Sequence, residues 1–113
     1  MNVQIFGTKK SFDSKKAERY FKERGIKYQF VDMKEKGLSK GEFNSVCQAV
    51  GGYEKLIDPK CKDKKLLALV QYLSEEDKKE KILENQKIIR TPIVRNGKQA
   101  TVGYEPDVWK DWK

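Results

Sequence analysis

The sequence predicts one α/β (α+β) domain over residues 1–113, with the element order βαβ, helical insertion, ββα. Two patterns predict this order: strand, helix and strand in residues 3–33, and two strands followed by a short helix in residues 89–112. Residues 39–84 lie between these patterns and have the helical periodicity expected of an insertion. A βαβ unit makes parallel strands and a tight hairpin makes antiparallel ones, so the predicted central sheet is mixed and four-stranded, with flanking helices.

The N-terminal unit is visible as alternation and spacing. VQIF (residues 3–6) alternates polar and apolar side chains as a strand does, and the loop GTKKSFD (residues 7–13) follows it. One apolar stripe then predicts a helix over residues 14–24, which Gly25 ends. KYQFVDM (residues 27–33) alternates again, which predicts the second strand.

The insertion is predicted to hold three helices. Ser39 and Glu42 have the spacing of a capping box at the start of the first helix, and Cys47 falls on its apolar, buried face. Leucines and valines at helical spacing mark a second helix near residues 66–73, and a third spans residues 74–84.

The C-terminal segment predicts a hairpin and a last helix. IRTPIVR (residues 89–95) and KQATVG (residues 98–103) flank Asn96-Gly97, a strong signal for a tight turn. Pro106 is typical of the first turn of a helix. Three apolar residues of this helix are expected to face inward: Val108, Trp109 and Trp112.

Composition limits the classes of function. The formal net charge of +8 favours anionic partners, but most basic residues are lysines interleaved with acids, which is typical of a solvated surface and disfavours nucleic-acid binding. No stretch approaches the roughly 20 apolar residues that a bilayer span needs. We therefore expect a cytoplasmic monomer without membrane contact.

The cysteine and histidine content excludes several chemistries. The chain has no histidine and only two cysteines, Cys47 and Cys61, without the spacing of a metal site, so we expect no metal and no bound cofactor. Both thiols are expected to be reduced. Cys61 lies between two lysines and is a candidate secondary reactive thiol; the alternative is an incidental cysteine with no role.

Three segments together resemble one family. They are IFGTKKSFDSKKAERYF (residues 5–21), GGYEKLIDPKCKDKKLL (residues 51–67) and IIRTPIVRNGKQATVGYEPDVW (residues 88–109). In order and spacing they are similar to the arsenate reductase (ArsC)/Spx group. The resemblance implies a thioredoxin-like fold with a helical insertion, in a lineage of thiol-dependent reductases and transcriptional regulators.

The resemblance implies that residue 11 is the position of the family's nucleophilic cysteine and residue 14 that of the second cysteine of the Spx branch. Here they are Ser11 and Ser14. A thiolate at a helix N-terminus has its pKa lowered from about 8.5 to roughly 3.5–7.5, whereas a serine hydroxyl forms no such anion and no disulfide. We therefore expect a redox-inactive site. The alternative is that Ser11 or Asp13 simply caps the helix.

The resemblance also implies ligand-binding positions. The arsenate branch uses three arginines, and the matching residues here are Lys60, Thr91 and Gly103, with Arg90 and Arg95 close by in sequence. The loop lysines Lys9 and Lys10 are further candidates. Pro92 matches the family's cis-proline, so the resemblance implies that Thr91 presents its backbone to a peptide or glutathione. The alternative is a trans proline at a strand edge.

Two hypotheses of function follow. In the first, the chain descends from an arsenate reductase-like oxidoreductase that uses glutathione or thioredoxin as co-substrate, and Ser11 has disabled it, by natural loss or by substitution. In the second, it is a non-catalytic Spx-like regulator or protein-binding module that docks on RNA polymerase or another protein.

Overall fold

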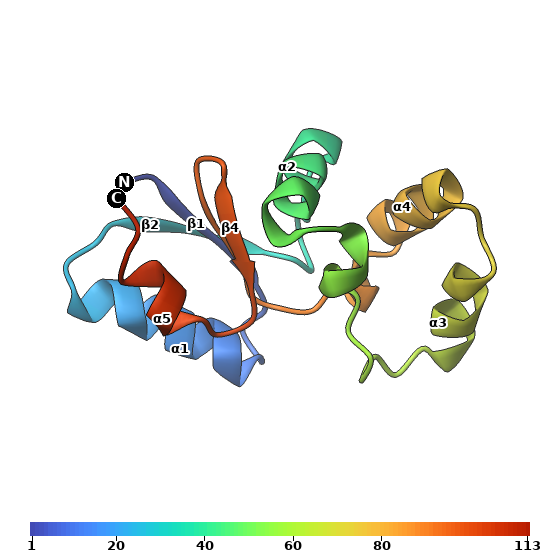
Figure 1. The fold of residues 1–113 in the computed structure, drawn as a ribbon. Coiled ribbons are helices and arrows are strands. Elements are labelled where there is room, and N and C mark those ends of the chain that lie inside the picture. Colours follow the sequence, from blue (N-terminus) through green and yellow to red (C-terminus); the bar gives the residue numbers. More distant parts are fainter.

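The computed structural model describes residues 1–113 and has a four-stranded mixed sheet in the order β2-β1-β3-β4 (Figure 1). The strand β1 is parallel to β2 and antiparallel to β3, and β3 is antiparallel to β4. The strands are β1 Val3–Gly7, β2 Tyr28–Asp32, β3 Ile93–Asn96 and β4 Gln99–Val102. The predicted sheet and element order are therefore confirmed, with β4 at one edge.

Five α-helices and two short 3-10 helices complete the fold. They are α1 Phe12–Glu23, α2 Lys40–Val50, η1 Tyr53–Leu56, α3 Lys64–Gln71, α4 Glu75–Glu84, η2 Gln86–Ile88 and α5 Pro106–Trp109. The insertion between β2 and β3 holds α2, α3 and α4, as predicted. None of the helices combines the length and apolar character required to cross a bilayer.

Two apolar clusters cover the two faces of the sheet. Because side chains alternate along a strand, Ile5 faces one cluster and Phe6 the other. The cluster around Ile5 includes side chains of α1 and α5, and the cluster around Phe6 includes side chains of α2 and the rest of the insertion. Figure 1 shows α1 and α5 close together and α2 beside β4.

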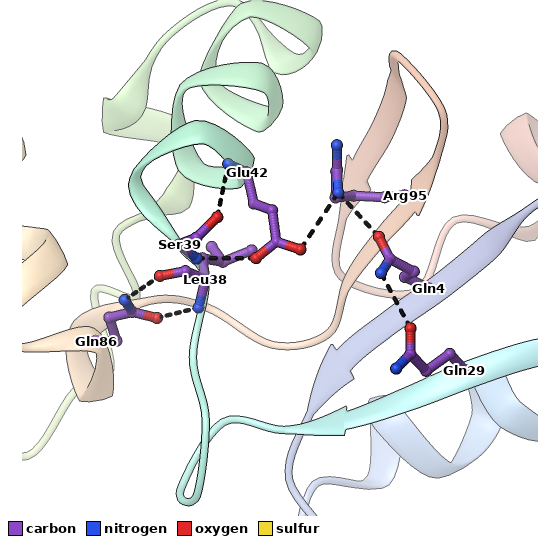
Figure 2. A network of polar contacts seen from close by, with 7 residues as sticks. All are labelled: Gln4, Gln29, Leu38, Ser39, Glu42, Gln86 and Arg95. Atoms are coloured by element: carbon purple, nitrogen blue, oxygen red, sulfur yellow. Dashed lines mark hydrogen bonds and ion pairs between the residues drawn. The ribbon is translucent and has the colours of Figure 1, made fainter.

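A chain of polar contacts fixes α2 relative to the sheet (Figure 2). The predicted capping box is present: Ser39 Oγ accepts from the Glu42 N–H, and Glu42 Oε1 accepts from the Ser39 N–H at 2.9 Å. The other carboxylate oxygen of Glu42 is 3.6 Å from Arg95 Nη1 of β3. Arg95 donates to Gln4 at 2.9 Å, and Gln4 donates to Gln29 at 3.1 Å, so these polar contacts extend from α2 to β2.

One side chain ties the end of the insertion to its beginning. Gln86 Oε1 accepts from the Leu38 N–H at 2.7 Å, and Gln86 Nε2 donates to the Leu38 carbonyl at 2.8 Å (Figure 2). Gly37 gives this amide its space, because a Cβ there would overlap Gln86 Oε1. The segments before α2 and after α4 are therefore held side by side.

The structure corrects the position of the turn in the predicted hairpin. Asn96 pairs with Gln99, so the two-residue loop is Gly97-Lys98 rather than Asn96-Gly97. Gly97 has φ 61°, the conformation that glycine adopts at the first position of a type II′ turn. Asn96 stays in the strand because its buried side chain accepts from the Asn2 N–H and donates to Gln99.

The predicted starts of one helix and one strand and the orientation of one side chain also differ from the structure. The helix α1 begins at Phe12, not at residue 14, because Ser11 provides its N-cap. The strand β3 begins only at Ile93, since Ile89 forms an isolated bridge with Ile57 of the insertion. Val108 is 43% exposed, so its predicted inward orientation is wrong; α5 is a single turn that buries Trp109.

Candidate functional site

The N-terminus of α1 faces a pocket of about 360 Å³, which we call the Ser11 pocket. Three segments that are distant in the sequence form this pocket. Its lining residues are Ser11, Asp13, Lys55, Ile57, Asp58, Pro59, Lys60, Arg90 and Thr91. Four predicted site residues, Ser11, Lys60, Arg90 and Thr91, are therefore brought together. The loop lysines Lys9 and Lys10 are exposed and do not line this pocket.

Ser11 is the N-cap residue of α1 and is half-buried. Its N–H donates to the Thr8 carbonyl at 3.2 Å, and its Oγ accepts from the Ser14 N–H at 3.2 Å, so the capping alternative is realised. The N–H groups of Phe12 and Asp13 have no partner within the protein, as is usual in a first turn. This end of α1 therefore carries partial positive charge beside the pocket, which favours an anionic ligand.

Ser14 lies outside the Ser11 pocket. It is fully buried under the end of β1, where its Oγ accepts from the Thr8 N–H at 3.3 Å. Gly7 makes this approach possible, since a Cβ there would overlap Ser14 Oγ and would be 2.8 Å from Ser14 Cβ. Ser14 shares its helix face with the buried Ala17 and Phe21, and this phase turns it toward the sheet. The two serines therefore have different surroundings.

Lys60 is held at the pocket by a turn. Asp58 Oδ1 accepts from the Lys60 N–H at 2.9 Å, and the Asp58 N–H donates to the Ile88 carbonyl at 2.8 Å, which anchors the turn to the end of the insertion. The next residue, Cys61, is outside the pocket. It is a free, half-buried thiol, with Sγ 3.8 Å from the Lys87 carbonyl and its side chain packed against the core.

Arg90 reaches the pocket from the segment before β3. Its N–H donates to the Leu56 carbonyl at 2.7 Å, and its guanidinium lies beside the backbone of Gly103. Neither Arg90 nor Lys60 has a carboxylate within salt-bridge distance, and the same holds for the third cation of the pocket, Lys55. These three cations against Asp13 and Asp58 leave the pocket with a positive balance.

The Thr91-Pro92 peptide bond is cis, as the resemblance implied. Pro92 is fully buried, and its carbonyl accepts from the Gly103 N–H at 2.8 Å, which fixes this segment to the chain after β4. The N–H and C=O of Thr91 form no hydrogen bond within the protein. Thr91 therefore offers one unpaired backbone donor and one acceptor at the wall of the pocket.

Lys55 lines the pocket but is not among the residues that the sequence predicted for the site. This residue belongs to η1, which follows Gly51-Gly52. The two glycines indicate a turn, but they do not indicate where the residues after it lie. Lys55 Nζ would be 3.3 Å from a Cβ on Gly51, which places the ammonium at the C-terminus of α2, where the helix dipole favours a cation.

No thiol lines the Ser11 pocket. Cys47 is buried in α2, and this burial raises the pKa of its thiol above the ordinary value of 9.0, against a smaller lowering effect of Lys79. No group of three or more histidine, cysteine, aspartate or glutamate side chains is arranged to hold a metal ion. The pocket can therefore hold an anion or pair with a peptide backbone, but it contains no nucleophilic sulfur.

Comparison with known proteins places these features in a family. The sequence profile of the ArsC family matches residues 6–112. The chain is 27% identical to the global transcriptional regulator Spx 2 of Oceanobacillus iheyensis, with all of this chain and 94% of the relative aligned. Both matches therefore extend over nearly the whole chain.

Solved structures have the same architecture. An arsenate reductase from Vibrio cholerae is 26% identical, with 96% of this chain and 94% of that chain covered and a TM-score of 0.82. A protein described as related to the ArsC family, from Bacteroides fragilis, has a TM-score of 0.86 at 20% identity, with coverage of 100% and 98%. The predicted thioredoxin-like fold is confirmed.

Proposed function

Because the chain belongs to the ArsC family of thioredoxin-like proteins, we propose that it is a binding member that holds a thiol-bearing anionic ligand in the Ser11 pocket without thiol–disulfide exchange. The ligand class is glutathione or a thiol protein. The observation that carries the proposal is the Ser11 hydroxyl at the N-terminus of α1, in a basic pocket that no thiol lines.

The chemistry of residue 11 supports binding rather than turnover. In disulfide exchange a thiolate attacks one sulfur of a disulfide and displaces the other as a thiolate. Ser11 has no sulfur to attack with or to be attacked, and its Oγ already accepts the Ser14 N–H. Arsenate reductase-like turnover at this residue would therefore need a cysteine that the chain lacks.

Recognition would use groups that are free in the structure. The carboxylates of glutathione would pair with Lys60 and Arg90, since arginine suits bidentate recognition of a carboxylate. The unpaired N–H and C=O of Thr91 would bond to the ligand's peptide groups. In this proposal the protein acts in the cytoplasm as a monomer.

The test compares the native chain with Ser11→Cys. In ¹⁵N NMR titrations with reduced glutathione, we expect the native protein to shift the amides of Ser11 and Thr91 without forming an adduct. After oxidised glutathione, Ser11→Cys should gain a mixed disulfide that peptide mapping places at residue 11. Ser11→Ala is the matched control and should bind without an adduct. Unchanged pocket amides at millimolar glutathione would contradict the proposal.

A second candidate function is that of an Spx-like regulator that docks on RNA polymerase. The observation that favours it is the whole-length similarity to a transcriptional regulator. Gel filtration of the chain with RNA polymerase purified from the same organism tests it. Co-elution of the two would favour this function over ligand binding alone, and separate elution would remove it.

A further inference from the structure

The strand β4 is an edge strand whose outer side is open. In the order β2-β1-β3-β4 it has a single neighbour, β3. In an antiparallel pair, alternate residues direct both backbone groups at the partner strand. The Gly103 N–H donates to the Pro92 carbonyl, so the backbone groups of residue 103 point at the β3 side. Because residues 99 and 101 are separated from residue 103 by even numbers of positions, their backbone groups also point at β3. Ala100 and Val102 therefore direct their N–H and C=O groups away from the sheet.

A groove of about 630 Å³ runs along this open edge. We call it the β4 groove; it is lined by Val50, Glu54, Lys55, Ile57, Arg90, Ala100, Thr101, Val102, Glu105 and Val108. Val50 and Ile57 form an apolar wall at the end of α2 and η1, and Val108 of α5 is the apolar residue opposite. Figure 1 shows β4 beside α2.

The β4 groove is continuous with the Ser11 pocket. Lys55, Ile57 and Arg90 line both the groove and the pocket. A bound peptide that follows β4 toward Gly103 would therefore pass over Arg90 and enter the pocket. The charges change along this path. In the groove Lys55 and Arg90 are balanced by Glu54 and Glu105, whereas the pocket has a positive balance.

We propose that an extended segment of a partner protein adds to β4 as a further strand, with an acidic residue entering the Ser11 pocket. Its backbone pairs with Ala100 and Val102, and its alternate side chains contact Val50 and Ile57 on one side and Val108 on the other. The balanced charge of the groove suits a neutral, β-branched stretch. Antiparallel pairing is the more stable arrangement, so the acidic residue is N-terminal to that stretch.

This inference rests on the proposed function only at the pocket end. Glutathione would occupy the Ser11 pocket without touching β4, whereas the partner segment needs both. The groove and the pocket are therefore tested with different probes: reduced glutathione for the pocket, and the peptide acetyl-Glu-Gly-Val-Thr-Val-Thr-amide for the groove.

The decisive measurement is amide hydrogen exchange by NMR on the whole chain, with and without this peptide. In the free protein the amides of Ala100 and Val102 should exchange quickly, because they have no partner, while those of Gln99 and Thr101 should already be protected by β3. With saturating peptide, exchange at Ala100 and Val102 should slow by at least about tenfold, as expected for newly paired amides. No change at these two amides would overturn the proposal.

Two matched variants test the side-chain contacts. Val108 and Leu69 are both exposed, at 43% and 44%, but Leu69 is on α3, outside the groove. Val108→Glu should weaken peptide binding by about tenfold or more, equivalent to about 1.4 kcal/mol, and Leu69→Glu should leave it unchanged. Equal effects of the two variants would overturn the proposal.

The remaining outcomes separate the alternatives. A peptide with lysine in place of its glutamate should bind more weakly. Equal binding of the two peptides would contradict the placement of an acidic residue in the Ser11 pocket. Protection of Ala100 and Val102 that rises with protein concentration in the absence of peptide would overturn the proposal in favour of a second copy of the chain. If the peptide protects β4 while glutathione leaves Ser11 and Thr91 unshifted, the inference stands and the proposed function falls.

Discussion

The guanidinium of Arg90 occupies the space that a side chain on Gly103 would need. A Cβ built on Gly103 would be 3.0 Å from Arg90 Nη2 and 3.2 Å from Arg90 Cζ, and Gly103 has φ 83°. In the family resemblance residue 103 is one of three arginine positions. Here residue 103 has no side chain, and the guanidinium of Arg90 occupies the space beside it.

Gly103→Ala should therefore disturb both stability and ligand binding. A left-handed φ costs a residue with a Cβ about 1–2 kcal/mol, and the new methyl group displaces Arg90. We expect that loss in the free energy of urea unfolding, together with weaker glutathione binding. Gly41→Ala is the control, because Gly41 lies in α2 with nothing within 4 Å of its Cβ position. Equal destabilisation by both variants would contradict this account.

Ser11→Cys should create a reactive thiol. The N-terminus of α1 and the cations of the Ser11 pocket stabilise the thiolate, so the pKa of the introduced thiol should fall below that of a free cysteine. Alkylation rates measured from pH 4 to 9, with mass mapping to residue 11, give this pKa. A titration like that of a free cysteine would show that the pocket does not favour an anion.

Ser14→Cys tests whether position alone decides reactivity. The thiol at residue 14 would be buried under β1 and screened from reagent, so we expect alkylation at least about tenfold slower than at residue 11. The larger sulfur also has to fit beneath Gly7, and we expect a lower midpoint of thermal unfolding. Rapid alkylation of a folded Ser14→Cys protein would disprove this description of the site.

The ion pair between Asp63 and Lys87 should appear in the pH dependence of stability. Its hydrogen bond and charge hold the pKa of Asp63 below its ordinary value of 3.8 and that of Lys87 above its ordinary value of 10.5. The contribution of Asp63 is therefore present above pH 3.8 and is lost as pH falls through the lowered pKa. That of Lys87 is present below pH 10.5 and is lost as pH rises through the raised pKa.

Denaturant unfolding across this range, for the native chain and for Asp63→Asn, measures the contribution. The difference in stability between the two proteins should shrink at acidic pH and again at strongly alkaline pH. A difference that is constant with pH would mean that the 2.9 Å pair contributes nothing to folding.

Cys47 should be the slower of the two native thiols. Burial raises the pKa of its thiol and blocks access, whereas Cys61 is only half-buried. With a thiol reagent at neutral pH, we expect modification of Cys47 to be at least about tenfold slower than that of Cys61, and to accelerate on unfolding. The variant Cys61→Ser isolates the slow phase, and a fast reaction in that variant would contradict the expectation.

The fold was predictable where local chemistry fixes it. Ser39 and Glu42 form the capping box that their spacing indicated, and Gly51 ends α2 in the left-handed conformation. Local patterns did not fix the hairpin register, because Asn96 is held by contacts to Asn2 at the other end of the chain. Val108 followed the apolar pattern but lies at the open edge of β4, where no element covers it.

The site was predictable in part. The resemblance marked Ser11, Lys60 and Thr91, which do line one pocket. It did not reveal that Lys55 joins them, since that depends on the fold of η1 after α2. The resemblance marked Ser11 and Ser14 alike as cysteine positions. It did not show that Ser11 faces the pocket and Ser14 the sheet, because that difference arises from the helix phase.

The burial of Ser14 has an evolutionary consequence. A single exchange of Ser11 for cysteine would place one thiol in the pocket, since residue 11 is half-buried and already at the helix N-terminus. A dithiol is a longer route, because sulfur at residue 14 also requires β1 to yield at Gly7. Variants of this chain that acquire redox chemistry should therefore first have a single cysteine at this site, and they should depend on an external thiol to resolve a mixed disulfide.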